Sequence, residues 1–163
     1  MLKQRGFTLT ELLITVTVLA VGASLVAPGA AQMIAKRNVQ SAAQSILDGL
    51  TQARVEAMRR NASVRFSLRA DGIGWTVTQV SSGESLRAFS SSNWSDLQLA
   101  SVDAANSVTF LPTGLLQSGT QLSQVTVSSG VSGSATRRVN VFGGGLMRMC
   151  DPSIDVADDP RRC

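Results

Sequence analysis

Apolar and polar positions divide the chain into an uncharged first stretch, an amphipathic middle and an alternating remainder. Residues 12–35 form a run of 24 positions without a formal charge. At about 1.5 Å per residue, a helix of that length crosses a hydrocarbon layer roughly 30 Å thick. We therefore predict a membrane-spanning helix over residues 7–35.

The middle stretch has the spacing of a helix with one apolar face. Small and apolar residues recur at steps of three and four, at Val39, Ala42, Ala43, Ile46, Leu50, Ala53 and Ala57. Residues 36–60 are therefore predicted to continue the same helix as an amphipathic segment. The whole helix would run from residue 8 to about residue 60, a length of roughly 80 Å, and its second half would lie against a sheet.

From Val64 onward, apolar side chains alternate with polar ones, as in a half-buried strand. Asp71 and Gly72 separate two such runs and predict a hairpin over residues 64–79. Further short strands are predicted over residues 97–100, 107–111, 123–128, 137–142 and 146–149.

The segments between these strands are rich in serine and glycine. Residues 81–95 are predicted to form a polar loop anchored by Trp94, and Gly143-Gly144-Gly145 is predicted to form a sharp turn. The predicted fold class is α+β: a long N-terminal helix packed against a C-terminal antiparallel β-sheet or β-sandwich head over residues 61–163.

Two residues within the apolar helix need an explanation. Glu11 stands at its leading edge, where a carboxylate deep in lipid costs roughly 2.5 to 3.5 kcal/mol without a partner. Cleavage after Gly6 would free an amine on Phe7, within about one helical turn of Glu11 on this chain or a neighbour. Pro28 has no N–H and its ring crowds the preceding turn, which predicts a kink or a softened turn.

The segment Gly6-Phe7-Thr8-Leu9-Thr10-Glu11-Leu12 resembles the type III (prepilin) signal of type IV pilins and type II secretion pseudopilins. The resemblance implies that residues 1–6 are a leader, that prepilin peptidase cuts after Gly6, and that it methylates the new amine of Phe7. It also implies a single-pass protein of the inner membrane with a periplasmic head. Phe7, Glu11 and Pro28 would then serve assembly with other major and minor pilins or pseudopilins.

The N-terminus has two other interpretations. An ordinary secretory signal could end near Gly29-Ala30-Ala31, but its apolar core spans only 7 to 15 residues and an acid at the start of that core is unusual. A plain membrane anchor accounts for the apolar length but leaves Glu11 unexplained.

A narrower resemblance covers the second half of the chain. Phe110-Leu111-Pro112-Thr113-Gly114, together with a last strand leading into Cys150-Asp151-Pro152-Ser153, is similar to the GspH/FimT group of minor pilins and pseudopilins. Residues 81–106 carry no motif of that group. The resemblance implies two sheet layers packed on the helix, and a structural subunit that initiates or caps assembly of a type IV pilus or a type II secretion pseudopilus.

The two cysteines, Cys150 and Cys163, bracket the C-terminal tail. In the oxidising periplasm they are predicted to form a disulfide, which would stabilise the head by roughly 3 kcal/mol on the loop-entropy model. A zinc site is the rival interpretation, but the chain has no histidine and offers only two thiols. We therefore expect neither a metal nor a cofactor.

The inventory of reactive side chains disfavours an enzyme. The chain has no His and no Tyr, and Lys36 is the only lysine outside residues 1–6. A Ser/Lys hydrolase would therefore depend on a lysine placed at the membrane edge.

Binding of double-stranded DNA, as in minor pilins of competence pili, is the alternative function. The Gly-Arg-x-Arg element associated with it is incomplete here, because Gly145-Leu146-Met147-Arg148 lacks the first arginine. The arginines that could contact phosphate are Arg137, Arg138, Arg148, Arg161 and Arg162, against four aspartates in the same region. Pairing of these arginines with the tail aspartates is favoured over DNA binding.

Overall fold

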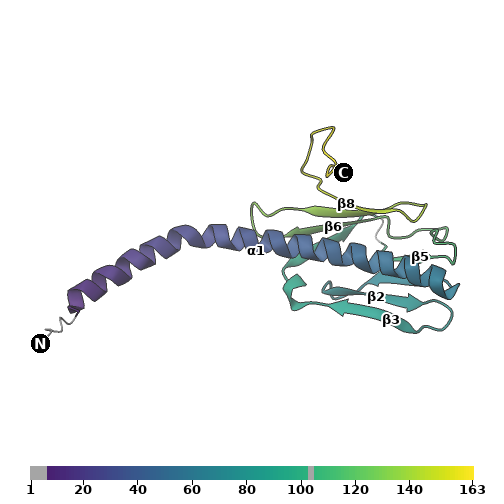
Figure 1. Ribbon diagram of the computed structural model, residues 1–163, viewed down its shortest axis with the longest axis horizontal. Coiled ribbons are helices and arrows are strands. Elements are labelled where there is room, and N and C mark those ends of the chain that lie inside the picture. Colours follow the sequence, from purple (N-terminus) through teal and green to yellow (C-terminus); the bar gives the residue numbers. More distant parts are fainter. Residues whose placement is uncertain (1–6, 103–104) are drawn as a thin grey trace, which may run out of the picture.

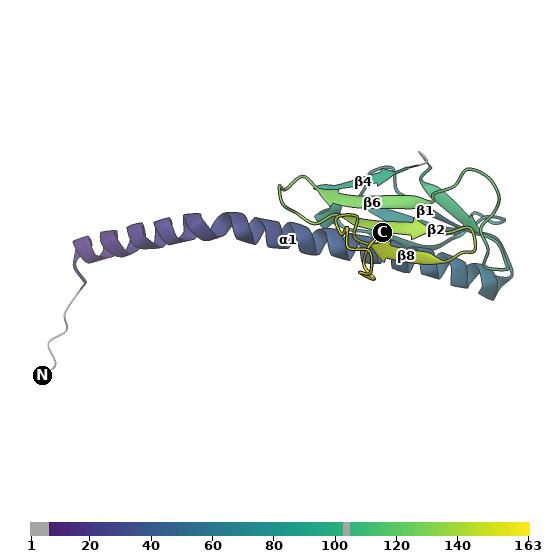
Figure 2. The same cartoon turned by 90° about the horizontal axis from the view of Figure 1, so that it is seen from above.

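The structure is a computed structural model that describes residues 7–102 and 105–163, without the side chains of residues 24–28. One long helix, α1 (Leu9–Arg60), runs the length of the molecule and carries a β-rich head on its second half (Figures 1 and 2). Its 52 residues correspond to about 78 Å. The prediction of a single helix ending near residue 60 is confirmed.

The N-terminal part of α1 projects beyond the head (Figure 1). Its large apolar side chains are exposed, with exposed fractions that range from 79% for Leu9 to 56% for Val16. Among the residues that the structure describes, no helical stretch is both long and apolar enough to cross a membrane. The predicted span over residues 7–35 includes the undescribed side chains of residues 24–28, Pro28 among them, and stays a prediction.

Within the described residues, eight strands form two antiparallel sheets. The first sheet has the order β3-β2-β1-β5 and contains β1 (Val64–Leu68), β2 (Gly74–Gln79), β3 (Ser85–Ser90) and β5 (Ser107–Phe110). The second has the order β4-β6-β7-β8 and contains β4 (Leu97–Ser101), β6 (Gln124–Ser129), β7 (Arg137–Val141) and β8 (Met147–Cys150). The predicted two-layer α+β fold is confirmed.

The prediction of a polar loop over residues 81–95 was partly wrong, because this region contains the strand β3. This strand pairs with β2 from Gly74↔Ser90 to Thr78↔Ser85, but almost all of its side chains are exposed. Without a buried face it shows no apolar alternation, so the sequence pattern gave no sign of it. The predicted anchor is confirmed, because Trp94, in the short 3-10 helix η1 (Ser92–Trp94), is only 3% exposed.

The core lies where the second half of α1 meets both sheets, with β6 and β8 on one side of the helix and β2 and β3 on the other in Figure 1. All seven residues of the predicted apolar face are fully buried: Val39, Ala42, Ala43, Ile46, Leu50, Ala53 and Ala57. Gly49 lets the helix approach closely, since a Cβ there would lie 2.8 Å from the Trp75 ring and 2.9 Å from the Phe66 ring.

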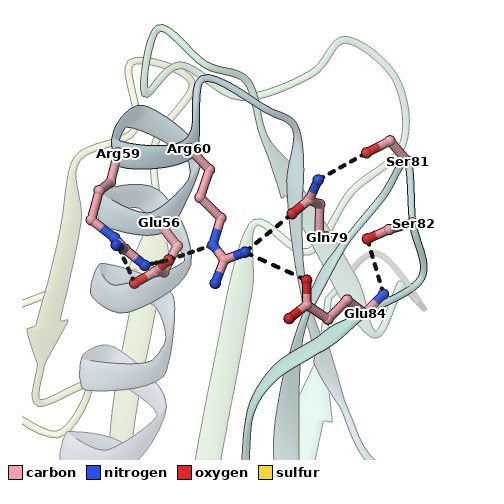
Figure 3. A network of polar contacts seen from close by, with 7 residues as sticks. All are labelled: Glu56, Arg59, Arg60, Gln79, Ser81, Ser82 and Glu84. Carbon is pink, nitrogen blue, oxygen red and sulfur yellow. Dashed lines mark hydrogen bonds and ion pairs between the residues drawn. The ribbon is translucent and has the colours of Figure 1, made fainter.

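A polar network joins the C-terminal end of α1 to the β2–β3 hairpin (Figure 3). Arg60 donates to Glu56 at 2.9 Å and reaches Gln79 and Glu84 at 3.4 and 3.5 Å. Hydrogen bonds from Arg59 and Arg60 lower the pKa of Glu56. Because the network is largely solvated, its ion pairs contribute little to stability.

Candidate functional site

The start of α1 is closed by a reciprocal cap between Thr8 and Glu11. The Thr8 hydroxyl accepts from the Glu11 amide at 3.3 Å, and Oε2 of Glu11 accepts from the Thr8 amide at 3.0 Å and from its hydroxyl at 2.8 Å. The other carboxylate oxygen, Oε1, makes no hydrogen bond or ion pair with another described residue. Glu11 therefore holds its own helix end and still presents an open acceptor.

The prediction for Glu11 considered only a cationic partner and missed this cap. The spacing Thr-x-x-Glu before an apolar run is the signal that could have revealed it. Phe7 is exposed next to the cap, whereas Gly6, the predicted cleavage site, lies outside the described residues. The roles of Gly6, Phe7, Glu11 and Pro28 stay predictions.

The C-terminal tail folds back onto the end of β8. The disulfide between Cys150 and Cys163 is present, with a Cα–Cα distance of 5.1 Å, and confirms that prediction. The Asp151 amide donates to the Arg161 carbonyl at 2.7 Å. Arg148 donates to the carbonyls of Pro160 and Arg162 at 2.6 and 3.0 Å. The tail is thus held by a covalent bridge and by backbone contacts.

Ion pairs occupy two of the other arginines proposed for DNA binding. Arg137 pairs with Asp151, and both side chains are largely buried, with 17% and 15% exposed. Burial alone would raise the pKa of Asp151, but hydrogen bonds from Ser153 and the charge of Arg137 lower it. Arg161 pairs with Asp159 at 2.8 Å, and its hydrogen bond lowers the pKa of Asp159 to about 2.

The contacts within the tail therefore engage Arg137, Arg148 and Arg161. Of the remaining two arginines, Arg138 has a buried Nε without a hydrogen-bond partner in the described part of the chain, and Arg162 is exposed. The structure does not gather five free guanidinium groups on one surface, and DNA binding stays an untested prediction.

Two turns with the same pattern of hydrogen bonds lie against each other next to Arg54 of α1. In one, Leu111 N donates to Leu115 O at 2.8 Å and Gly114 N to Leu111 O at 2.8 Å. In the other, Phe142 N donates to Leu146 O at 2.9 Å and Gly145 N to Phe142 O at 2.7 Å. The sharp turn predicted at residues 143–145 is confirmed.

The glycines of these turns touch each other. Gly114 and Gly145 have φ values of +77° and +76°, a left-handed conformation that favours glycine. A Cβ on Gly145 would lie 2.3 Å from the Gly114 carbonyl oxygen, which accepts from Arg54 Nε at 3.1 Å. One helix side chain is therefore hydrogen-bonded to the first turn and lies next to the second. Both turns end in the dipeptide Gly-Leu, which could have indicated that they have the same conformation. No sequence pattern near Arg54 indicated that its side chain would donate to one of them.

In the described ranges, no group of three or more acidic residues and cysteines is placed to hold a metal ion. The chain presents an exposed apolar half-helix with an acid at its start. Its head has a turn hydrogen-bonded to the helix, and its tail is closed by a disulfide.

Comparison with known proteins identifies this combination. The family model described as Type II transport protein GspH matches residues 42–145, and the prokaryotic N-terminal methylation motif matches residues 1–27. The chain belongs to the GspH family. The predicted resemblance is confirmed: this GspH family member is a minor pilin or pseudopilin of a type IV pilus or a type II secretion system.

Family membership settles two further points. GspH family proteins are structural subunits, so the chain is not an enzyme. The methylation motif implies processing by prepilin peptidase, and the family implies other pilins as partners.

Solved structures share the fold. The type IV minor pilin FimU of Pseudomonas aeruginosa is 21% identical, with a TM-score of 0.57 over 72% of this chain and 92% of that one. The minor pseudopilin EpsH of the Vibrio cholerae Type 2 Secretion System is 18% identical, with a TM-score of 0.54 over 72% of this chain and 99% of that one. At these identities the likeness shows the fold alone. No curated protein matches this chain significantly.

Proposed function

We propose that this GspH family member is a filament subunit that initiates or caps assembly of a type IV pilus or a type II secretion pseudopilus. The observation that carries the proposal is the exposed apolar half of α1. Nine large apolar side chains between residues 7 and 21 are each at least 56% exposed in the single chain. A surface of that extent is stable only when lipid or other subunits cover it.

Glu11 provides the docking chemistry in this proposal. Its Oε2 is used by the Thr8 cap, and its Oε1 is open to a donor from outside the chain. The methylated amine of Phe7 on a neighbouring subunit is a cation of the right kind. In the apolar filament core such a pair is strongly favoured over an isolated carboxylate.

Location at the inner membrane, with the head in the periplasm, is part of the same proposal. The methylation motif and the 24 uncharged residues over positions 12–35 support it. Before assembly, lipid would cover the apolar half-helix, and after assembly neighbouring helices would replace the lipid. Fractionation of the cell envelope tests this location, and recovery of the chain in the soluble periplasm would contradict it.

Two substitutions of Glu11 test the docking step, because they separate the effect of the charge from the effect of the helix cap. Glu11→Ala removes the charge and the cap. Glu11→Gln removes the charge but keeps an amide oxygen that can accept from the Thr8 amide. If the Phe7 amine pairs with Glu11, both variants are processed normally, and both fail to enter filaments beside wild-type subunits.

Recovery of sheared filaments and immunoblotting with a tag on the head measures incorporation. Wild-type incorporation of Glu11→Gln would show that the cap alone matters and would refute the ion pair. Deletion of the gene tests the initiating role separately. If the subunit initiates assembly, cells without it should form no filaments. Filaments of normal number and length in such cells would contradict that role.

A further inference from the structure

A cavity of about 340 Å³ opens where the head meets the projecting half of α1. Its walls come from four segments that are far apart in the sequence. Lys36 and Gln40 belong to α1, Arg137 to β7, Met149 and Cys150 to β8, and Asp151 and Arg161 to the tail. Lys36 follows Ala35, the first buried position among the described side chains of the helix, so the cavity lies at the end of the head nearest the apolar half-helix.

The cavity wall carries an excess of positive charge. Lys36, Arg137 and Arg161 contribute three positive charges and Asp151 one negative charge. The Asp151 carboxylate is occupied, because it accepts from the Ser153 amide at 3.0 Å and from the Ser153 hydroxyl at 2.5 Å and also pairs with Arg137. Its single negative charge also acts on Arg161, so one carboxylate stands against three cations on this wall.

Several donors remain open on this wall. Lys36 makes no hydrogen bond or ion pair with another described residue, although it is an ammonium group with three donors. Arg161 donates to Asp159 through Nε and Nη2, which leaves Nη1 without a hydrogen bond to another described residue. Arg137 uses Nη1 for its contacts with Asp151 and the Thr136 carbonyl, which leaves Nε and Nη2. These donors match the oxygens of an anion.

We propose that Lys36, Arg137 and Arg161 form a binding site for a small phosphate ester. The volume accommodates a phosphate group with a substituent of a few heavy atoms. The amide of Gln40 and the apolar wall of Met149 suit a substituent that has both hydroxyl and carbon surface. The tail completes the site, because the Cys150–Cys163 bridge keeps Arg161 beside the helix.

Two sources could supply such a group: the glycerophosphate headgroup of an anionic phospholipid and a soluble phosphate ester. The position of Lys36, directly after the uncharged residues 12–35, corresponds to the headgroup level of a membrane and favours the lipid. This choice of source rests on the proposed membrane location, whereas the phosphate site itself does not.

The test is an isothermal titration of the full processed chain in neutral maltoside micelles. The probes are glycerol 3-phosphate and the short-chain lipid dihexanoyl-phosphatidylglycerol, with dihexanoyl-phosphatidylcholine as the zwitterionic comparison. Lys36→Gln and Arg161→Gln should each weaken binding of both anionic probes by about tenfold, the cost of one charge-assisted hydrogen bond. Arg37→Gln is the matched control: it removes the same charge one residue away, from a side chain that does not line the cavity.

Absence of binding by the wild-type chain would overturn the proposal, and so would an equal loss in Arg37→Gln and Lys36→Gln, which would indicate nonspecific attraction. Tighter binding of the anionic lipid than of glycerol 3-phosphate supports the site with a headgroup as its ligand, and equal binding supports it with a soluble ester. If envelope fractionation contradicts the membrane location, the glycerol 3-phosphate titration still decides the site.

Discussion

Replacement of Gly145 by alanine tests whether the contact between the two turns stabilises the head. The added methyl group would sit 2.3 Å from the Gly114 carbonyl oxygen, so one turn must move away from the other. That movement also disturbs the hydrogen bond from Arg54 to the same oxygen. The left-handed backbone costs about 1–2 kcal/mol with alanine, and a weakened charge-assisted hydrogen bond costs about 1.5–3 kcal/mol. We expect the free energy of unfolding to fall by about 2.5–5 kcal/mol.

Gly83→Ala is the matched control for this substitution. Gly83 has a similar φ of +70°, but a Cβ there meets no atom within 4 Å. It therefore carries the backbone cost alone, about 1–2 kcal/mol. Urea titration of the full chain in micelles, followed by tryptophan fluorescence, measures both variants, because Trp75 and Trp94 are both buried in the head. Equal losses in the two variants would refute the argument that the close approach matters.

Three further predictions concern the tail. Replacing both Cys150 and Cys163 by serine should lower the free energy of unfolding by at most about 3 kcal/mol and should leave far-ultraviolet circular dichroism unchanged, since the sheets do not depend on the bridge. Because the pKa of Asp151 is lowered in the folded chain, its contribution to stability should be complete above the ordinary aspartate pKa of about 3.9. It should be lost as the pH falls below that value, and Asp151→Asn should flatten this part of the pH–stability curve. Double-stranded DNA should bind weakly or not at all at physiological salt, and micromolar binding that Arg148→Ala abolishes would contradict this expectation.

The sequence by itself determined the long helix, its buried face and most of the strands. The residues from Val39 to Ala57 could be assigned because a period of 3.6 is a local property of the chain. The strands around Phe66 and Val139 have buried faces, and their alternation marks them in the same way. The disulfide followed from having only two cysteines and an oxidising compartment. The resemblance to the prepilin signal depended on seven adjacent residues.

Only the tertiary structure decided the features in which distant segments meet. Strand β3 exists because β2 offers it hydrogen bonds, although its exposed side chains carry no pattern. Arg54 donates to one turn 60 residues away along the chain and lies next to a second turn that is farther still. Lys36 and Arg161 line one cavity because the helix, the sheet and the tail fold together. Periodicity records which side of an element is buried, but the choice of what it is buried against is made by long-range packing, which no local stretch of sequence encodes.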